Sequence, residues 1–240
     1  MSGAVVGGSV RERRRAQTVR EIKDAALRQL DEGGAGSLSL RAVGRALGMT
    51  VQSLYHYFDG RDALLTELVA DSHNALADAV QACADATRGQ PAPVRLQAAC
   101  QAYRDWADQH RTQFLLLYGT PVPGYRPPAE GPIGAAARRL ADPFLDVVFD
   151  GWSPEELAAV PLQPGAEEIA TMDPPGLPLP PGALALFIEL RGRLHGLVML
   201  ELLGHSHPLN AHAGALFRGA VSRMSADLSA LRGGMANLCP

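Results

Sequence analysis

The chain of 240 residues has very little lysine and cysteine: Lys23 is its only lysine, and its three cysteines are Cys83, Cys100 and Cys239. The cysteines are too few and too scattered for a metal cluster or an even set of disulfides, which favours a reducing cytoplasm. No apolar run reaches membrane-spanning length, and residues 1–10 have neither the charge nor the apolar centre of a signal peptide. We therefore expect a cytoplasmic protein without a membrane partner.

Motifs that commonly mark an enzyme are also missing. The sequence has no phosphate-cradling glycine loop, no nucleophile elbow and no histidine–glutamate zinc helix. His205, His207 and His212 lie near one another, but the first two flank a serine just before a proline, which favours a solvated turn over a metal site. We predict a protein that is not an enzyme and needs neither a metal ion nor another cofactor.

Apolar residues make up 47% of the chain and charged residues 20%, which is ordinary for a soluble protein. The charge is distributed unevenly. Residues 1–61 contain ten Arg or Lys and six Asp or Glu, a net charge of +4, and because the whole chain carries −3, residues 62–240 carry −7. A basic head on an acidic body suits a head that meets phosphate, although a chance fluctuation also produces an imbalance of this size.

Residues 39–65 contain the most informative pattern. Ser39 is placed to cap a short helix that Gly48 ends, and Thr50 is placed to cap a second one. Apolar side chains of the second helix recur at helical spacing on one face: Val51, Leu54, Tyr55 and Phe58. The opposite face carries Gln52, Ser53, His56 and Tyr57. A short helix with one apolar and one hydrogen-bonding face suits reading of the DNA major groove, and on spacing alone an ordinary helical hairpin fits equally well.

The run LYHYF (54–58) followed by GRDALL (60–65) resembles the signature of the tetracycline-repressor-like (TetR) family of transcription regulators. The preceding run LSLRAVGRALGMTVQSL is similar to the helix-turn-helix of that family, and the resemblance covers about residues 15–68. Tyr57 stands where histidine is usual, Gly60 where serine or asparagine is usual, and Arg61 where lysine is usual. Gly60 implies a weaker cap on the connecting helix.

We therefore predict an all-α fold in which an N-terminal three-helix helix-turn-helix DNA-binding domain is joined by a long helix to a helical ligand-binding and dimerisation domain. The expected parts are a disordered N-terminus (1–10), the DNA-binding domain (11–62) and the ligand-binding and dimerisation domain (63–240). The first helix is expected at about residues 16–31. A cluster of arginines precedes it, either as an arm for the DNA backbone or minor groove or as a solvated helix start: Arg11, Arg13, Arg14 and Arg15.

The resemblance implies a set of DNA contacts. Gln52 and Ser53 would read base edges with Thr50 nearby, and Tyr55 would add an apolar contact or a phosphate hydrogen bond. His56, Tyr57 and Arg61 would hold phosphates, while Ser39 and Arg41 would clamp the backbone. A homodimer would place two such helices in successive major grooves of a double-stranded, near-palindromic operator, about 34 Å apart.

Helical spacing continues through the rest of the chain. It predicts helices at about 61–88, 91–110, 133–152, 183–203 and 208–231, with shorter ones at 114–118 and 153–160. The last two long helices are apolar over much of their surface and contain glycines, which favours close packing in a homodimer interface, in an intramolecular core, or in both. The proline-rich stretch 161–181 is predicted to be a mobile cover or a disordered segment.

The run RLHGLVMLELLGH resembles the C-terminal domain of a TetR subfamily with a tryptophan-x-x-x-histidine-glycine segment, with Arg191 at the tryptophan position. Arg191 and His195 share a helix face, so they would anchor a polar or anionic ligand group, or else pair with a carboxylate such as Glu189 or with the partner subunit. The other expected pocket residues are mainly apolar: Tyr103, Trp106, Phe114, Tyr118, Phe144, Val148, Phe187 and Met199. They predict a largely apolar small-molecule effector.

The leading hypothesis is a homodimeric bacterial repressor that associates with the nucleoid when bound to DNA and is released by its effector. Activation instead of repression stays open. A small-molecule binding or sequestering protein with a vestigial DNA-binding head is the alternative. An all-helical enzyme is disfavoured because no acid, base and nucleophile converge.

Overall fold

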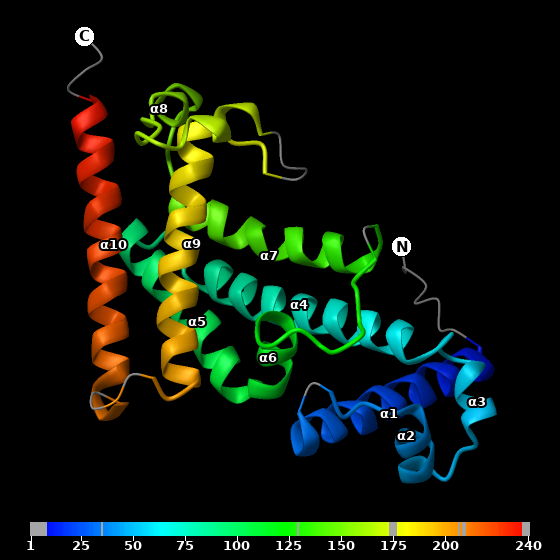
Figure 1. Ribbon diagram of the computed structural model, residues 1–240. Helices are drawn as coiled ribbons and strands as arrows, with labels where there is room; N and C mark the ends of the chain where they lie inside the picture. The colour runs from blue at the N-terminus through cyan, green and yellow to red at the C-terminus, as the bar shows by residue number, and fades with distance from the viewer. Residues whose placement is uncertain are drawn as a thin grey trace, which may run out of the picture. The chain divides into compact units, whose positions relative to one another are not determined.

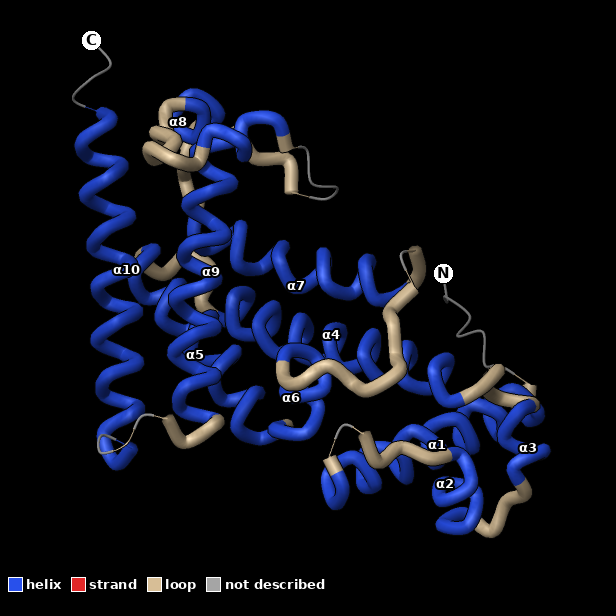
Figure 2. Tube along the Cα trace, in the orientation of Figure 1, coloured by secondary structure: helices blue, strands red, loops and turns tan. Residues whose placement is uncertain are grey.

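The computed structural model describes residues 9–34, 36–128, 130–172, 177–205, 207 and 210–236. Within these ranges every regular element is a helix, which confirms the predicted all-α fold (Figure 2). The helices, labelled in Figure 1 where there is room, are α1 (Val10–Gly33), α2 (Leu40–Leu47), α3 (Val51–Tyr55), α4 (Arg61–Ala86), α5 (Ala92–Gln109), α6 (Arg111–Tyr118), α7 (Pro132–Val148), α8 (Pro154–Ala158), α9 (Pro181–Leu202) and α10 (Ala213–Ala236), with short 3-10 turns η1 (Glu167–Thr171) and η2 (Asn210–His212). Among the described residues, no helix combines the length and apolar character needed to span a bilayer.

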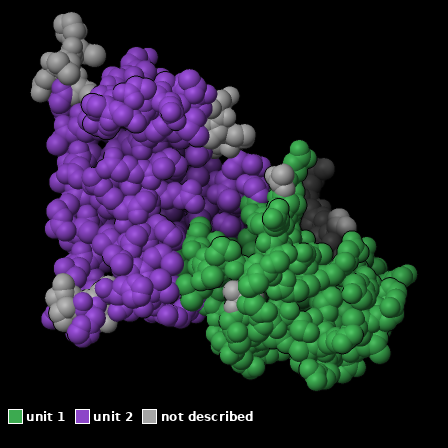
Figure 3. Space-filling model, viewed as in Figure 1, with its two compact units in different colours: residues 1–72, 112–133 green, residues 73–111, 134–240 purple. Residues whose placement is uncertain are grey.

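The chain divides into two compact units, coloured green and purple in Figure 3. Unit 1 comprises residues 1–72 and 112–133, and unit 2 comprises residues 73–111 and 134–240. Helix α4 therefore begins in one unit and ends in the other. This division differs from the expected boundary between residues 62 and 63, because the first turns of α4 and residues 112–133 belong to the same unit as the N-terminal helices.

The core of unit 1 explains why residues 112–133 belong to it. Ile22 of α1, Leu54 of α3 and Leu64 of α4 are fully buried in one apolar cluster. Val122, from the loop after α6, joins this cluster with only 7% of its surface exposed. The hydroxyl groups of Thr66 in α4 and Tyr125 in the same loop lie 3.0 Å apart. The loop is therefore part of the packing that holds the three N-terminal helices together.

Helix α1 starts at Val10, about two turns earlier than expected, because Ser9 forms a capping box. The hydroxyl of Ser9 accepts the Glu12 N–H at 3.2 Å, and the Glu12 carboxylate accepts the Ser9 N–H at 2.6 Å. The prediction of disorder was therefore wrong for Ser9 and Val10, and its remainder, residues 1–8, lies outside the described residues. The arginine cluster lies within the first turns of the helix instead of ahead of it.

Lys23 fastens α1 to α4 within unit 1. Its ammonium lies 3.0 Å from a Glu67 carboxylate oxygen and 2.7 Å from an Asp71 carboxylate oxygen. Burial disfavours the charged ammonium, but the two carboxylates outweigh this effect and raise the pKa of Lys23. The pairing fixes the rotation of α1 against the first turns of α4.

In unit 2, α5 packs against both α9 and α10, and α9 and α10 run alongside each other (Figure 1). Arg104 of α5 joins all three helices. Its Nε donates to Glu201 Oε2 at 2.7 Å and its Nη2 donates to Glu201 Oε1 at 2.5 Å, while the guanidinium carbon lies 5.4 Å from the centre of the Phe217 ring. A bidentate, half-buried pair of this kind is directional, so it fixes the axial register of α5 against α9.

Several boundaries differ from the expected ones. Helix α7 ends at Val148 rather than near residue 152, and α10 starts only after the η2 turn but extends beyond residue 231. Ser153 caps α8: its hydroxyl accepts the Glu156 N–H at 3.2 Å. Residues 161–181 include the η1 turn, and residues 173–176 of this stretch lie outside the described residues.

Replacing Val122 by alanine tests the contribution of the loop to unit 1. We expect Val122→Ala to destabilise the unit by about 1–3 kcal/mol, since it removes buried methyl groups from a packed core. Hydrogen exchange of the α1 amides should accelerate accordingly. Val94→Ala, at a valine of α5 that is 47% exposed, is the control and should leave this exchange unchanged. Unaltered α1 exchange in Val122→Ala would show that the loop does not support the head.

Candidate nucleic-acid interface

The turn between α2 and α3 depends on two glycines. Gly48 ends α2 with a φ of 65°, a left-handed conformation that confirms the predicted helix stop. The Met49 N–H then donates to the Gly44 carbonyl at 2.8 Å. A Cβ on Gly44 would lie 2.8 Å from the Met49 oxygen, so a side chain at this position would force the turn apart. The two glycines therefore permit the close turn between α2 and α3.

The two helices are capped differently. The Thr50 hydroxyl accepts the Ser53 N–H at 3.1 Å and lies 2.8 Å from the Ser53 hydroxyl, so the predicted Thr50 cap is confirmed. Ser39 occupies the cap position of α2, but its side chain makes no capping hydrogen bond, so that prediction was wrong. Instead the Ser39 N–H donates to the Gln29 side-chain oxygen at 2.6 Å, because α1 passes close enough to satisfy it.

The buried side of α3 determines which side chains point outward. Leu54 is fully buried and Phe58 is 6% exposed, whereas Gln52 and His56 are exposed. Tyr55, which the spacing placed on the apolar face, is 48% exposed and so belongs to the outer surface. The outer surface of this helix therefore presents an amide, a phenol and an imidazole.

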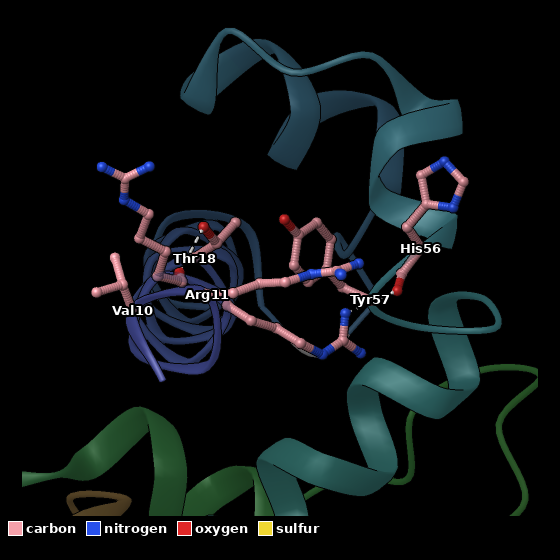
Figure 4. Close-up of a pocket in the computed structure, with 7 residues that line it drawn as sticks. Val10, Arg11, Thr18, His56 and Tyr57 are labelled. Atoms are coloured by element: carbon pink, nitrogen blue, oxygen red, sulfur yellow. Dashed lines mark hydrogen bonds between the residues drawn. The ribbon is translucent and has the colours of Figure 1, made fainter. Parts of the chain in front are cut away.

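Arg15 of α1 holds the end of α3, a contact that sequence reasoning missed. Its Nη1 donates to the His56 carbonyl at 3.1 Å, and its guanidinium carbon lies 5.1 Å from the centre of the half-buried Tyr57 ring. Figure 4 shows the pocket beside this contact, with the His56 imidazole pointing away from the arginine side chains. The partners are 41 positions apart in sequence, so no local pattern signals the contact.

Arg61, expected to hold a phosphate, points inward. Its Nε donates to the Leu38 carbonyl at 3.0 Å and its Nη1 lies 3.5 Å from the Pro123 carbonyl oxygen. The guanidinium therefore braces unit 1. Gly60, just before it, has a φ of 147°, a conformation that favours glycine and accounts for the departure from serine or asparagine. Arg41 is exposed at the start of α2.

Two family profiles match the chain. One, described as bacterial regulatory proteins of the tetR family, matches residues 22–68, which contain α2, the turn and α3. The other, described as a tetracyclin repressor-like C-terminal domain, matches residues 96–224, more than half of the chain. The chain belongs to the TetR family.

The curated relatives include HTH-type transcriptional regulators of Mycobacterium bovis and Mycobacterium tuberculosis. Each is 39% identical to this TetR-family chain over 137 residues, which are 57% of this chain and 58% of the relative. The match thus spans less than two thirds of the length of those relatives.

Solved structures extend the likeness to most of the TetR-family chain. The crystal structure of the regulatory protein SCO4313 is 32% identical, covers 90% of this chain and 98% of its own, and has a TM-score of 0.75. A protein of unknown function from Rhodococcus sp. RHA1 is 21% identical, with coverages of 92% and 98% and a TM-score of 0.60, and it supports the fold alone.

The predicted ligand-binding residues fall into two groups. Phe114 and Tyr118 belong to unit 1, where their rings meet edge to face at 5.1 Å. The others belong to unit 2: Tyr103, Trp106, Phe144, Val148, Phe187, Arg191, His195 and Met199. Of these, the first three and Phe187 take part in ring contacts, with Tyr103 against Phe144 at 5.9 Å.

One polar pair stands out in unit 2 of this TetR-family chain. The buried Tyr103 of α5 places its hydroxyl 3.0 Å from Nδ1 of His195 in α9. Burial lowers the pKa of His195, and the positive charge of Arg191 lowers it further. Arg191 itself is exposed, and it is Arg193, not Arg191, that pairs with Glu189 at 2.7 Å. A neutral His195 ring can accept a hydrogen bond from the Tyr103 hydroxyl at Nδ1.

The lowered pKa of His195 predicts a pH dependence of stability. Below its ordinary value of 6.5 the unfolded chain takes up a proton that the folded chain resists, so the free energy of unfolding should decrease as pH falls below 6.5. His195→Gln should make this decrease shallower, because glutamine does not titrate. Urea unfolding over a pH series checks the difference. Equal slopes for wild type and His195→Gln would contradict the prediction, and Tyr103→Phe serves as the control that keeps the histidine.

Proposed function

We propose that this chain is a transcriptional repressor that binds a near-palindromic operator as a homodimer and is released by a largely apolar small molecule. The observation that carries the proposal is the outer face of α3, where Gln52, Tyr55 and His56 are exposed above a buried Leu54. A short helix fixed by its buried side, with hydrogen-bonding groups outward and a compact support behind it, is suited to entering the major groove.

The contacts divide by chemistry. Gln52, whose amide both donates and accepts, is the candidate for bidentate pairing with a base such as adenine, with Thr50 and Ser53 beside it. Tyr55 supplies an apolar surface and a hydroxyl for the sugar–phosphate backbone, Tyr57 supplies a second hydroxyl, and His56 supplies an imidazole N–H. Ser39 and Arg41 add backbone contacts from the start of α2. Arg61 is left out of the phosphate contacts because two carbonyl oxygens already engage it.

Dimerisation is assigned to α9 and α10. Large apolar side chains on these two helices and at the C-cap of α9 remain exposed in the single chain: Ile188 (46%), Leu200 (50%), Leu203 (43%) and Leu216 (45%). Gly192 and Gly196 of α9 have open space where a Cβ would stand, which permits close approach of another helix. Apolar groups of this size on adjacent helices favour burial against a second copy.

The effector site is assigned to unit 2, around the Tyr103–His195 pair. Apolar rings nearby favour a mostly hydrocarbon ligand, and the phenol and imidazole provide partners for one polar group. Release from DNA requires that the ligand bind the non-binding state of the dimer more tightly than the DNA-binding state.

Gln52→Ala tests base reading. We expect the variant to lose about 1–3 kcal/mol of preference for its operator over random DNA, while binding to random DNA stays the same. Mobility-shift titrations with the DNA upstream of the reading frame and with a random duplex measure the difference. Val94→Ala, at an exposed position of α5 outside the proposed dimer interface, is the control. An unchanged preference in Gln52→Ala would remove this residue from the reading set, and no preference in the wild type would overturn the proposal.

Leu216→Asp tests the dimer. The side chain is already 45% exposed, so the substitution should cost the single chain little stability, but it places a charge in the assigned interface. We expect sedimentation to show a monomer where the wild type is a dimer. Val94→Asp, at a position of similar exposure on α5, should remain dimeric. A dimeric Leu216→Asp would place the interface elsewhere.

A further inference from the structure

The first turns of α1 carry charge in a fixed arrangement. The Ser9 capping box starts the helix at Val10, so Arg11, Arg14 and Arg15 occupy positions related by three and four residues. Side chains at this spacing project from the same side of a helix. Since the capping box also engages the Glu12 carboxylate, the nearest acidic group in sequence is turned to the helix end instead of to the arginines.

These arginines line a pocket of about 530 Å³ together with Val10, Thr18, His56 and Tyr57, and none of the described residues that line it carries a carboxylate (Figure 4). Arg15 is committed to the His56 carbonyl and the Tyr57 ring. Neither Arg11 nor Arg14 has a carboxylate partner among the residues that the structure describes. Like charges gathered on one side of a helix destabilise it, so an anion in the pocket would offset their repulsion.

We infer that this pocket is a seat for one phosphodiester of duplex DNA, with Arg11 and Arg14 as its donors and Arg15 as the positioning residue. The inference rests on the proposed function and assigns a backbone contact within it. Guanidinium groups bind phosphate oxygens through paired N–H donors, which suits two exposed arginines at one pocket. The pocket adjoins the end of α3, so a phosphate held there lies next to the groove that α3 would enter.

The assignment also accounts for the inward Arg61. In this chain Arg61, the basic residue that follows α3, braces Leu38 and Pro123, so it does not supply charge to the DNA backbone. The start of α1 supplies it. The backbone contact thereby depends on α1 being helical from Val10 onward, which links the seat to the Ser9 cap.

The test compares two double variants of the full chain with the same charge change. Arg11→Gln with Arg14→Gln alters the seat, and Arg20→Gln with Arg28→Gln alters exposed positions of α1 that do not line the pocket. Binding to a random-sequence duplex is measured over a range of salt concentrations. The affinity falls as salt rises, and we expect this fall to be less steep in the seat variant, with the magnitude of the slope of log affinity against log salt smaller by about 1. At low salt the seat variant should bind roughly tenfold more weakly than the wild type. The control should keep the wild-type slope.

Two outcomes would overturn the inference. One is a wild-type slope in the seat variant, and the other is an equal loss of slope in both variants, which would indicate general charge rather than a seat. In either case operator preference in the wild type would leave the proposed function standing. Helix content by circular dichroism, expected to be equal in all three proteins, excludes unfolding as the cause. No duplex binding by the wild type would overturn both proposals.

Discussion

A helix of five residues has no appreciable stability of its own, because it forms too few hydrogen bonds to repay the ordering of its backbone. The orientation of α3 therefore comes entirely from what surrounds it: the Thr50 cap at its start, the burial of Leu54 beneath it and the Arg15 contact at its end. Other residues of unit 1 also hold α3 in this orientation. Gly44 allows the close turn before α3, and Arg61 and Val122 complete the core on which it stands.

The local sequence pattern was enough to predict where α2 ends, where α3 begins and which side of α3 is buried. Gly48 and Thr50 are residues whose conformation and chemistry mark a helix stop and start, and the spacing of Leu54 and Phe58 identified the buried face. Tyr55 was misplaced because an aromatic ring fits either face of a short helix. The Ser9 cap was missed because the residues before it carry no apolar period, although Ser9 and Glu12 form a readable capping box.

Contacts between segments that are far apart in the sequence could not be predicted from local patterns. Val122 lies in a proline-rich loop whose composition indicates only a turn, yet its burial decides that the loop belongs to the head. Arg61 was expected to face phosphate because an exposed arginine and a bracing arginine have the same sequence appearance. In unit 2, Tyr103 and His195 were each expected near a ligand, but their contact across 92 positions depends on the packing of α5 against α9. Adjacent Arg104 holds the same two helices through Glu201.

The single lysine has a consequence for chemical modification. Because Lys23 is the only lysine of the chain, acetylation or an amine-reactive dye can alter one side-chain amine and no other. That amine is held between Glu67 and Asp71, so acylating it would leave two carboxylates of α4 facing each other without a counter-charge. Acylation of Lys23 would therefore act directly on the contact between α1 and α4.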